Sequence, residues 1–237
     1  RVELTPQGRA YAGDIRRALA AIAGSAARQA GRGISGALTV SCTPGFAASW
    51  LCTRIGTYHA TCPDVALSVI TPRRLEDVSN PDADLFICFG RGEAAGMHVE
   101  LLKEVEFTPL CSPALLNRLG GIAEPADVLR STLLHLFDHG DWEAWLRLAG
   151  LPVDHARSGV LLADMNLVHS AALASQGIAM GDEFICRHDM EDGRLVRPFD
   201  LAIRSPSSYH LVVPREKADN PAVIAFREWI RQEMGSD

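Results

Sequence analysis

The sequence lacks the short motifs that mark many enzyme sites. Neither the G-x-G-x-x-G turn of dinucleotide-binding proteins nor a P-loop occurs, and the G-x-S-x-G elbow of α/β-hydrolases is missing too. No apolar run approaches the length of a membrane span, and no apolar stretch follows the charges at the start. We therefore expect no cofactor, no catalysis, no membrane association and no secretory signal.

Positive charge is also scarce. Lys and Arg number 23 against 29 Asp and Glu, which gives a formal net charge of −6. A domain that binds nucleic acid by neutralising phosphates is usually basic, so this chain is a poor candidate for binding DNA by itself. Hydrophobic residues make up 47% of the sequence, enough for a sizeable core in one large or two small domains.

The six cysteines include no C-x-x-C pair, and most of them fall in apolar stretches. This pattern is typical of buried, reduced thiols in a cytoplasmic protein. Thiol oxidation at Cys42 or Cys111 in place of ligand binding remains an alternative that the sequence leaves open.

Residues 1–30 predict a long helix with a narrow apolar stripe formed by Ile15, Leu19 and Ile22. A helix with so narrow a stripe cannot bury itself alone, so we expect it to link and dimerise two copies of the chain. The alternative is a helix that lies on its own domain. The flexible joint GRGISG, over residues 31–36, follows it.

After residue 36 the pattern alternates between strand and helix. Strands are expected over residues 38–42, 65–71, 83–89, 99–111, 132–137, 159–162, 178–180 and 209–213, and helices over 43–60, 72–78, 113–119, 124–129, 142–148, 165–175 and from 221 to beyond 230. Such alternation predicts an α/β fold of βα units on parallel sheets.

Two successive sets of these units predict two Rossmann-like lobes. One lobe covers residues 36–107 and 212–237, and the other covers 108–211. The connection near Phe107 is itself strand-like, which favours a hinge of crossover strands and a ligand cleft between the lobes. A single continuous sheet would contradict this interpretation.

Four stretches carry a family resemblance. RVELTPQGRAYAGDIRRAL, over residues 1–19, resembles the end of the winged helix-turn-helix and the linker helix of LysR-type transcriptional regulators. The stretch over residues 38–69 resembles the first β-α-β unit of their effector-binding domain, ADLFICFGRG resembles its Asp-x-x-Ile-x-x-Gly strand, and residues 208–233 resemble its last strand and helix. The pattern is similar to the branch that contains the glycine-cleavage activator and the β-lactamase regulator.

The resemblance implies a fold of the periplasmic-binding-protein type II and a small-molecule effector, such as a small carboxylate or amino-acid-like metabolite. It implies a homodimer or tetramer that contacts DNA only through a winged helix-turn-helix, expected before Arg1. Two other classes remain open: a solute-binding protein of the same fold, and a two-lobed enzyme.

Two helix starts are candidates for gripping the effector, because unpaired N–H groups there attract a carboxylate. At the first, Thr43 offers a hydroxyl, Pro44 opens the helix and Phe46 offers an apolar wall. The alternative is that Thr43 serves only as an N-cap. At the second, Met165 and Asn166 follow Asp164, whose carboxylate can itself cap the helix and compete with an anion.

The remaining candidates lie at strand ends, where ligands of open α/β sheets bind. Phe89, Gly90 and Arg91 end one predicted strand, and Arg91 can pair with a carboxylate or be an ordinary solvated arginine. Cys111 follows the first crossover, and Tyr209 lies near the return crossover.

Phe137 ends a strand of the second lobe and is a further candidate for the wall of the site. His135 and His139, on either side of it, have the spacing of a helical metal site, but they span a strand and a turn, so we expect no metal there.

Overall fold

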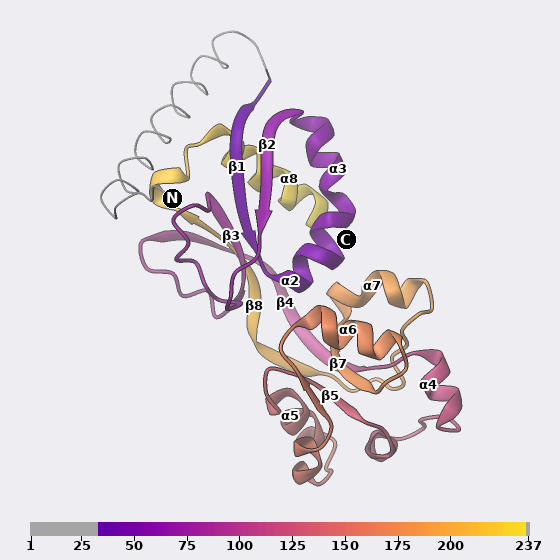
Figure 1. Cartoon of the computed structure of the whole chain (residues 1–237). Helices are drawn as coiled ribbons and strands as arrows, with labels where there is room; N and C mark the ends of the chain where they lie inside the picture. Colours follow the sequence, from indigo (N-terminus) through magenta and orange to yellow (C-terminus); the bar gives the residue numbers. More distant parts are fainter. Residues whose placement is uncertain (1–32, 236–237) are drawn as a thin grey trace, which may run out of the picture. The chain divides into compact units, whose positions relative to one another are not determined.

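The structure is a computed structural model that describes residues 33–235, so the predicted linker helix over 1–30 lies outside the described residues. In chain order the elements are β1 (Ser35–Cys42), α2 (Pro44–Phe46), the π-helix η1 (Ala47–Leu51), α3 (Cys52–Thr61), β2 (Asp64–Ile70), β3 (Leu85–Gly90), β4 (Met97–Leu110), α4 (Pro113–Arg118), the 3-10 helix η2 (Pro125–Arg130), β5 (Leu133–Leu136), α5 (Gly140–Leu148), the 3-10 helix η3 (Val153–Arg157), β6 (Val160–Leu162), α6 (Met165–Leu173), β7 (Ile178–Asp182), α7 (Glu183–Glu191), β8 (Ile203–Pro214), the 3-10 helix η4 (Arg215–Lys217) and α8 (Pro221–Gly235) (Figure 1).

The described chain divides into two compact units. Unit 1 contains residues 33–43, 51–103 and 209–235, and unit 2 contains residues 44–50 and 104–208. The long strands β4 and β8 each pass from one unit into the other, as expected for crossover strands. The segment Pro44–Trp50 is a further passage, which the sequence did not indicate.

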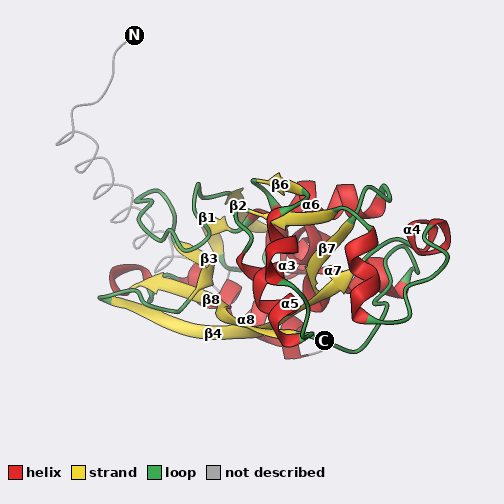
Figure 2. Cartoon of the chain, turned by 90° about the horizontal axis from the view of Figure 1, so that it is seen from below, coloured by secondary structure: helices red, strands yellow, loops and turns green. Residues whose placement is uncertain are grey.

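The eight strands form one hydrogen-bonded order, β2-β1-β3-β8-β4-β7-β5-β6. The expectation that two lobes exclude a single continuous sheet is therefore wrong, because the two compact units share one strand order. The physical reason is the length of β4 and β8, which run side by side (Figure 2) and contribute residues to both units. Hydrogen bonding between strands therefore continues through β4 and β8, although the chain forms two compact units.

Unit 1 contains parallel strands and two helices. β1 pairs in parallel with β2 and with β3, in a register that sets Cys42 opposite Ile87. Tyr58 of α3 packs its ring against Phe226 and Trp229 of α8, with ring centroids 5.2 and 5.4 Å away. These aromatic contacts join α3 to α8, and α8 packs on β1. Figure 1 shows both helices in unit 1.

A nearly buried ion pair fastens η4 to the strand region of unit 1. The Nζ atom of Lys217 lies 3.1 Å from Oδ1 of Asp84 and donates to the carbonyl oxygen of Ala83 at 2.7 Å. The other carboxylate oxygen of Asp84 accepts from the backbone N–H of Thr39 at 2.8 Å. The pair therefore ties three segments that are far apart in the sequence.

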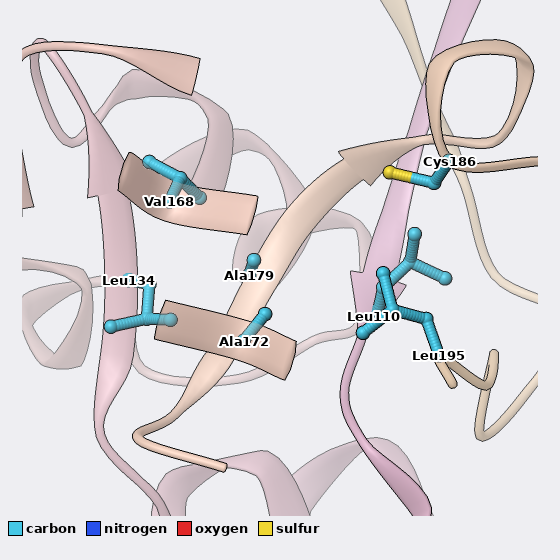
Figure 3. Close-up of a cluster of buried hydrophobic side chains, with 7 residues drawn as sticks. All are labelled: Leu110, Leu134, Val168, Ala172, Ala179, Cys186 and Leu195. Atoms are coloured by element: carbon cyan, nitrogen blue, oxygen red, sulfur yellow. The ribbon is translucent and has the colours of Figure 1, made fainter. Parts of the chain in front are cut away.

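Unit 2 is built on β4, β5, β6 and β7. β5 pairs in parallel with β6 and β7, and β7 pairs antiparallel with β4. A core cluster lies between these strands and helices α6 and α7 (Figure 3), and its members are Leu110, Leu134, Val168, Ala172, Ala179, Cys186 and Leu195. α5 packs on β5, and the indole N–H of Trp142 donates to the carbonyl oxygen of Leu134 at 2.9 Å.

Two local expectations fail. Residues 72–78 form no helix, because the Asp77 carboxylate accepts from both the backbone N–H and the hydroxyl of Ser79, a local turn that competes with helix formation. α7 was not expected, since its buried residues are mostly consecutive and form no clear helical stripe. Within residues 33–235, no helix combines the length and hydropathy that crossing a bilayer requires.

Candidate functional site

Two of the predicted site residues, Thr43 and Phe89, lie at the carboxyl ends of the parallel strands β1 and β3 of unit 1, and a third, Tyr209, packs against Phe89. Thr43 directly follows β1, and its backbone N–H donates to the carbonyl oxygen of Ile87 on β3 at 3.0 Å. Phe89, two residues further along β3, packs its ring against Tyr209 of β8, with centroids 5.0 Å apart. Ligands of open α/β sheets bind at this kind of edge, so these residues stay candidates for the effector site.

The Thr43 hydroxyl is the least expected feature of this edge. Thr43 is 2% exposed, and its Oγ1 has no hydrogen-bond partner among the described residues. The alternative that Thr43 is an N-cap is therefore wrong, because a cap would accept a backbone N–H. A buried hydroxyl without a partner is costly, which makes it a candidate to bind a polar ligand atom.

The loop after β3 carries Arg91, which is exposed and forms no ion pair within residues 33–235. Gly90 ends the strand against Glu76, and Gly92 adopts a φ of +75°. A Cβ atom at Gly92 would lie 2.6 Å from Nε2 of His210, so this glycine allows the loop to rest on the imidazole. His210 was missed by the sequence analysis, since only the loop's packing reveals it.

Unit 2 has two helix starts at strand ends, and a carboxylate occupies each. At α6, Asp164 Oδ1 accepts from the backbone N–H of Asn166 at 2.7 Å. At α7, Asp182 Oδ1 accepts from the backbone N–H of Phe184 at 2.9 Å. Both positive helix ends already carry a negative charge, so the expected cap at Asp164 is confirmed.

The helical segment that starts at Pro44 differs from these two. Its first turn contains no acidic residue, and the residue before it is Thr43 with its unpartnered hydroxyl. Of the three helix starts that follow strands β1, β6 and β7, this one alone keeps a positive end without a carboxylate cap.

Unit 2 also brings the two predicted helix starts together. α2 contacts α6, and a Cβ atom at Gly45 would lie 3.1 Å from Cγ of Met165. The side chain of Met165 therefore occupies the space beside Gly45. Phe46 is fully buried against Trp50 and Phe184, with centroids 5.0 and 5.9 Å away, so its ring belongs to the core of unit 2.

Phe137 is held in an unusual conformation at the end of β5. Its φ is +62°, and the backbone N–H of Asp138 donates to the carbonyl oxygen of Leu136 at 2.7 Å, which closes a strained three-residue turn. The N–H of Phe137 donates to the carbonyl oxygen of Leu162 at 2.9 Å, and its side chain is 47% exposed. The turn therefore keeps a large aromatic ring partly in solvent. Its partner Leu162 ends β6, two residues before Asp164.

Cys111 is fully buried and pairs its backbone with Val196. Burial raises the pKa of its thiol to about 11, and burial also raises the pKa of the Cys42 thiol. Thiolates are the reactive form, so both cysteines are poor candidates for the redox alternative. All six cysteines are free, and Cys52 is exposed, contrary to the expectation of uniformly buried thiols.

The described residues contain no group of three or more side chains that could hold a metal ion. His135 and His139 do lie together, with ring centroids 4.5 Å apart. His135 Nε2 donates to the carbonyl oxygen of Ser158 at 2.7 Å, while the Nδ1 atoms of both histidines are buried without a partner among the described residues.

The chain has two compact α/β units, two long crossover strands that contribute to both, and candidate ligand groups at strand and helix ends. These features are typical of two-lobed ligand-binding domains. The family model for the LysR substrate binding domain matches residues 31–235, and the chain belongs to this family. It is the effector-binding domain of a LysR-type transcriptional regulator.

Curated relatives agree with this assignment. The chain is 32% identical over 227 residues to the glycine cleavage system transcriptional activator of Escherichia coli K12, covering 96% of this chain and 74% of the relative. It is 31% identical over 193 residues to the transcriptional activator AmpR of Citrobacter koseri, covering 81% of this chain and 66% of the relative. These relatives are transcription regulators, which favours that function over a solute-binding protein.

Solved structures confirm the fold. The effector domain of AmpR from Pseudomonas aeruginosa matches with a TM-score of 0.72 at 26% identity, over 84% of this chain and 96% of that one. The AmpR effector binding domain from Citrobacter freundii matches with a TM-score of 0.75 at 23% identity, over 86% of this chain and all of that one. The predicted α/β fold of the periplasmic-binding-protein type II is confirmed.

Proposed function

We propose that the chain senses a small carboxylate or amino-acid-like metabolite in the cytoplasm, without catalysing a reaction. It acts as a homodimer or tetramer, and a separate winged helix-turn-helix contacts the DNA. The effector shifts the equilibrium between two conformations of the domain, to an extent set by its different affinities for them. The division into lobes of residues 36–107 with 212–237 and 108–211 belongs to this proposal.

The buried, unpartnered hydroxyl of Thr43 is the observation that carries the proposal. It directly precedes a helical segment whose start has no acidic cap, so a carboxylate placed there gains both a hydroxyl donor and the positive helix end. Phe89 and Tyr209 supply an aromatic surface at the same edge of unit 1. Arg91, exposed on the next loop, is a second candidate for the carboxylate.

The α6 start suits a different chemical group. Its N–H groups already have the Asp164 carboxylate, so an anion there would be repelled, whereas an ammonium group would be attracted. α2 and α6 contact each other, which places this negative charge near the helix that begins after Thr43. Asn166, Met165, Phe137 and Cys111 stay proposed effector-binding residues of unit 2. Because of the Asp164 charge, we expect a zwitterion to bind better than a dicarboxylate.

Thermal denaturation tests the site with a defined panel of acetate, succinate, glycine, alanine and dialanine. We expect a zwitterionic compound to raise the melting temperature, and Thr43→Val to reduce that rise. Thr61→Val, at the exposed end of α3, is the control that should leave the rise unchanged. A rise that persists unchanged in Thr43→Val would reject this site, and a rise given only by succinate would reject the zwitterion.

Light scattering tests the assembly state separately. A regulator of this family is expected to be a dimer or larger, whereas a freestanding solute-binding protein is expected to be monomeric. A monomer at all accessible concentrations would contradict the proposed oligomer.

A further inference from the structure

The turn that presents Phe137 joins two histidines whose environment is unusual. His135 lies in β5 and is 1% exposed, and His139 precedes α5. Because the Ser158 carbonyl oxygen only accepts hydrogen bonds, Nε2 of His135 carries a proton and Nδ1 is its basic atom. That atom and Nδ1 of His139 are both buried without a partner among residues 33–235. The rings lie edge to face, 4.5 Å apart.

Asp138 connects this histidine pair to the turn. Its backbone N–H closes the strained turn through Leu136, and its side chain accepts from the backbone N–H of Gly140 at 2.8 Å. Its charge also acts on His135. A proton taken up by the histidine pair would attract the Asp138 carboxylate, and any movement of Asp138 changes the hydrogen bond that holds Phe137 at positive φ.

We propose that the segment His135–His139 is a proton-responsive element that releases the strained turn holding Phe137 when the histidine pair is protonated. Its consequence for effector binding rests on the proposed function, in which Phe137 lines the site. The release itself does not depend on any effector.

The titration of the neighbouring groups supports this element. Burial lowers the pKa of His135, the carbonyl of Ser158 partly offsets that change, and His139 lowers the pKa further. Burial and the charge of Asp138 raise the pKa of Asp141 to about 6. Next to this turn, therefore, the pKa of a carboxyl is raised to about 6 and the pKa of a buried imidazole is lowered.

Charged groups also lie on the elements around the histidine pair. The 3-10 helix η3, which packs on α5, carries Asp154, His155 and Arg157, all of them exposed. α5 itself also carries Glu143 and Arg147, α6 carries His169, and β7 carries Asp182. The charges that act on His135 are those of His139 and Asp138. The element is therefore local to the turn.

Histidine and amide NMR signals of the full chain, followed from about pH 8 to about pH 5, test the proposal. The imidazole signals of His135 and the amide signals of Phe137 and Asp138 should shift with one common midpoint. His139→Gln keeps a polar side chain without a titrating group, so the amide shifts should be lost in it. His155→Gln removes a nearby exposed imidazole and should leave them unchanged.

A second variant guards against misfolding. Asp138→Asn keeps the acceptor for Gly140 but removes the charge, so the common midpoint should move to lower pH. Amide signals of Phe137 and Asp138 that stay constant over this range, or that shift equally in His139→Gln, would overturn the proposal. No effector is present, so that result would leave the Thr43 proposal standing, and a failed Thr43 experiment would leave this one standing.

Discussion

Replacing Thr43 with valine is expected to stabilise the ligand-free chain. Valine has nearly the shape of threonine, and the only group lost is a hydroxyl that is buried and unpartnered within the described part of the chain. Burying such a group costs about 1–3 kcal/mol, so its removal should raise the free energy of unfolding by about that amount. In a chain of this size each kcal/mol corresponds to about 2–4 °C in melting temperature.

Thr108 is a matched control, because Thr→Val should have the opposite effect on the free energy of unfolding there. It is 1% exposed, but its hydroxyl donates to the carbonyl oxygen of Leu201 at 3.2 Å. Thr108→Val removes a satisfied hydrogen bond and should lower the free energy of unfolding by about 1–2 kcal/mol. Urea denaturation of both variants, without effector, measures the difference. If Thr43→Val destabilised the chain as much as Thr108→Val, the hydroxyl would have a partner in the fold and the argument for the site would fail.

Three further predictions concern stability and can be checked by urea denaturation. Gly92→Ala should lower the free energy of unfolding by at least about 1 kcal/mol more than Gly96→Ala does. Both glycines have a φ of +75°, but only a Cβ atom at Gly92 would clash with the imidazole of His210. Equal losses in the two variants would contradict this packing. Lys217→Met should lower the free energy of unfolding by about 3 kcal/mol, because the Asp84 carboxylate loses its charged partner. Arg215→Met, at an exposed residue of the same turn, should change it little. Asp141→Asn should raise the free energy of unfolding by about 1–2 kcal/mol near pH 7. The reason is that the pKa of Asp141 is raised to about 6, so its ionised form disfavours the folded state above that pH. This advantage should shrink as the pH falls through about 6 toward 4, and an advantage independent of pH would refute the assigned cause.

Much of the fold followed from local patterns in the sequence. The apolar run Leu85–Cys88 indicated a strand buried on both faces, and the structure confirms it. Asp164 before an apolar helix indicated a capped start, which is also confirmed. The extended stretch around Phe107 indicated the first crossover strand. In each case, neighbouring residues alone carry enough information.

Features that depend on distant contacts escaped the sequence. The burial of Phe46 results from Phe184, far along the chain, so no local pattern separates a core ring from a ligand wall. The positive φ of Phe137 violates the preference of a bulky residue and is imposed by hydrogen bonds to Leu162 and across the turn. The missing partner of the Thr43 hydroxyl is a property of its folded surroundings.

A crystal structure of the chain with the compound that raises its melting temperature most would test the central claim directly. The account predicts a carboxylate oxygen of that compound within hydrogen-bonding distance of Oγ1 of Thr43. A compound bound elsewhere, with the Thr43 hydroxyl making no contact to it, would contradict the account.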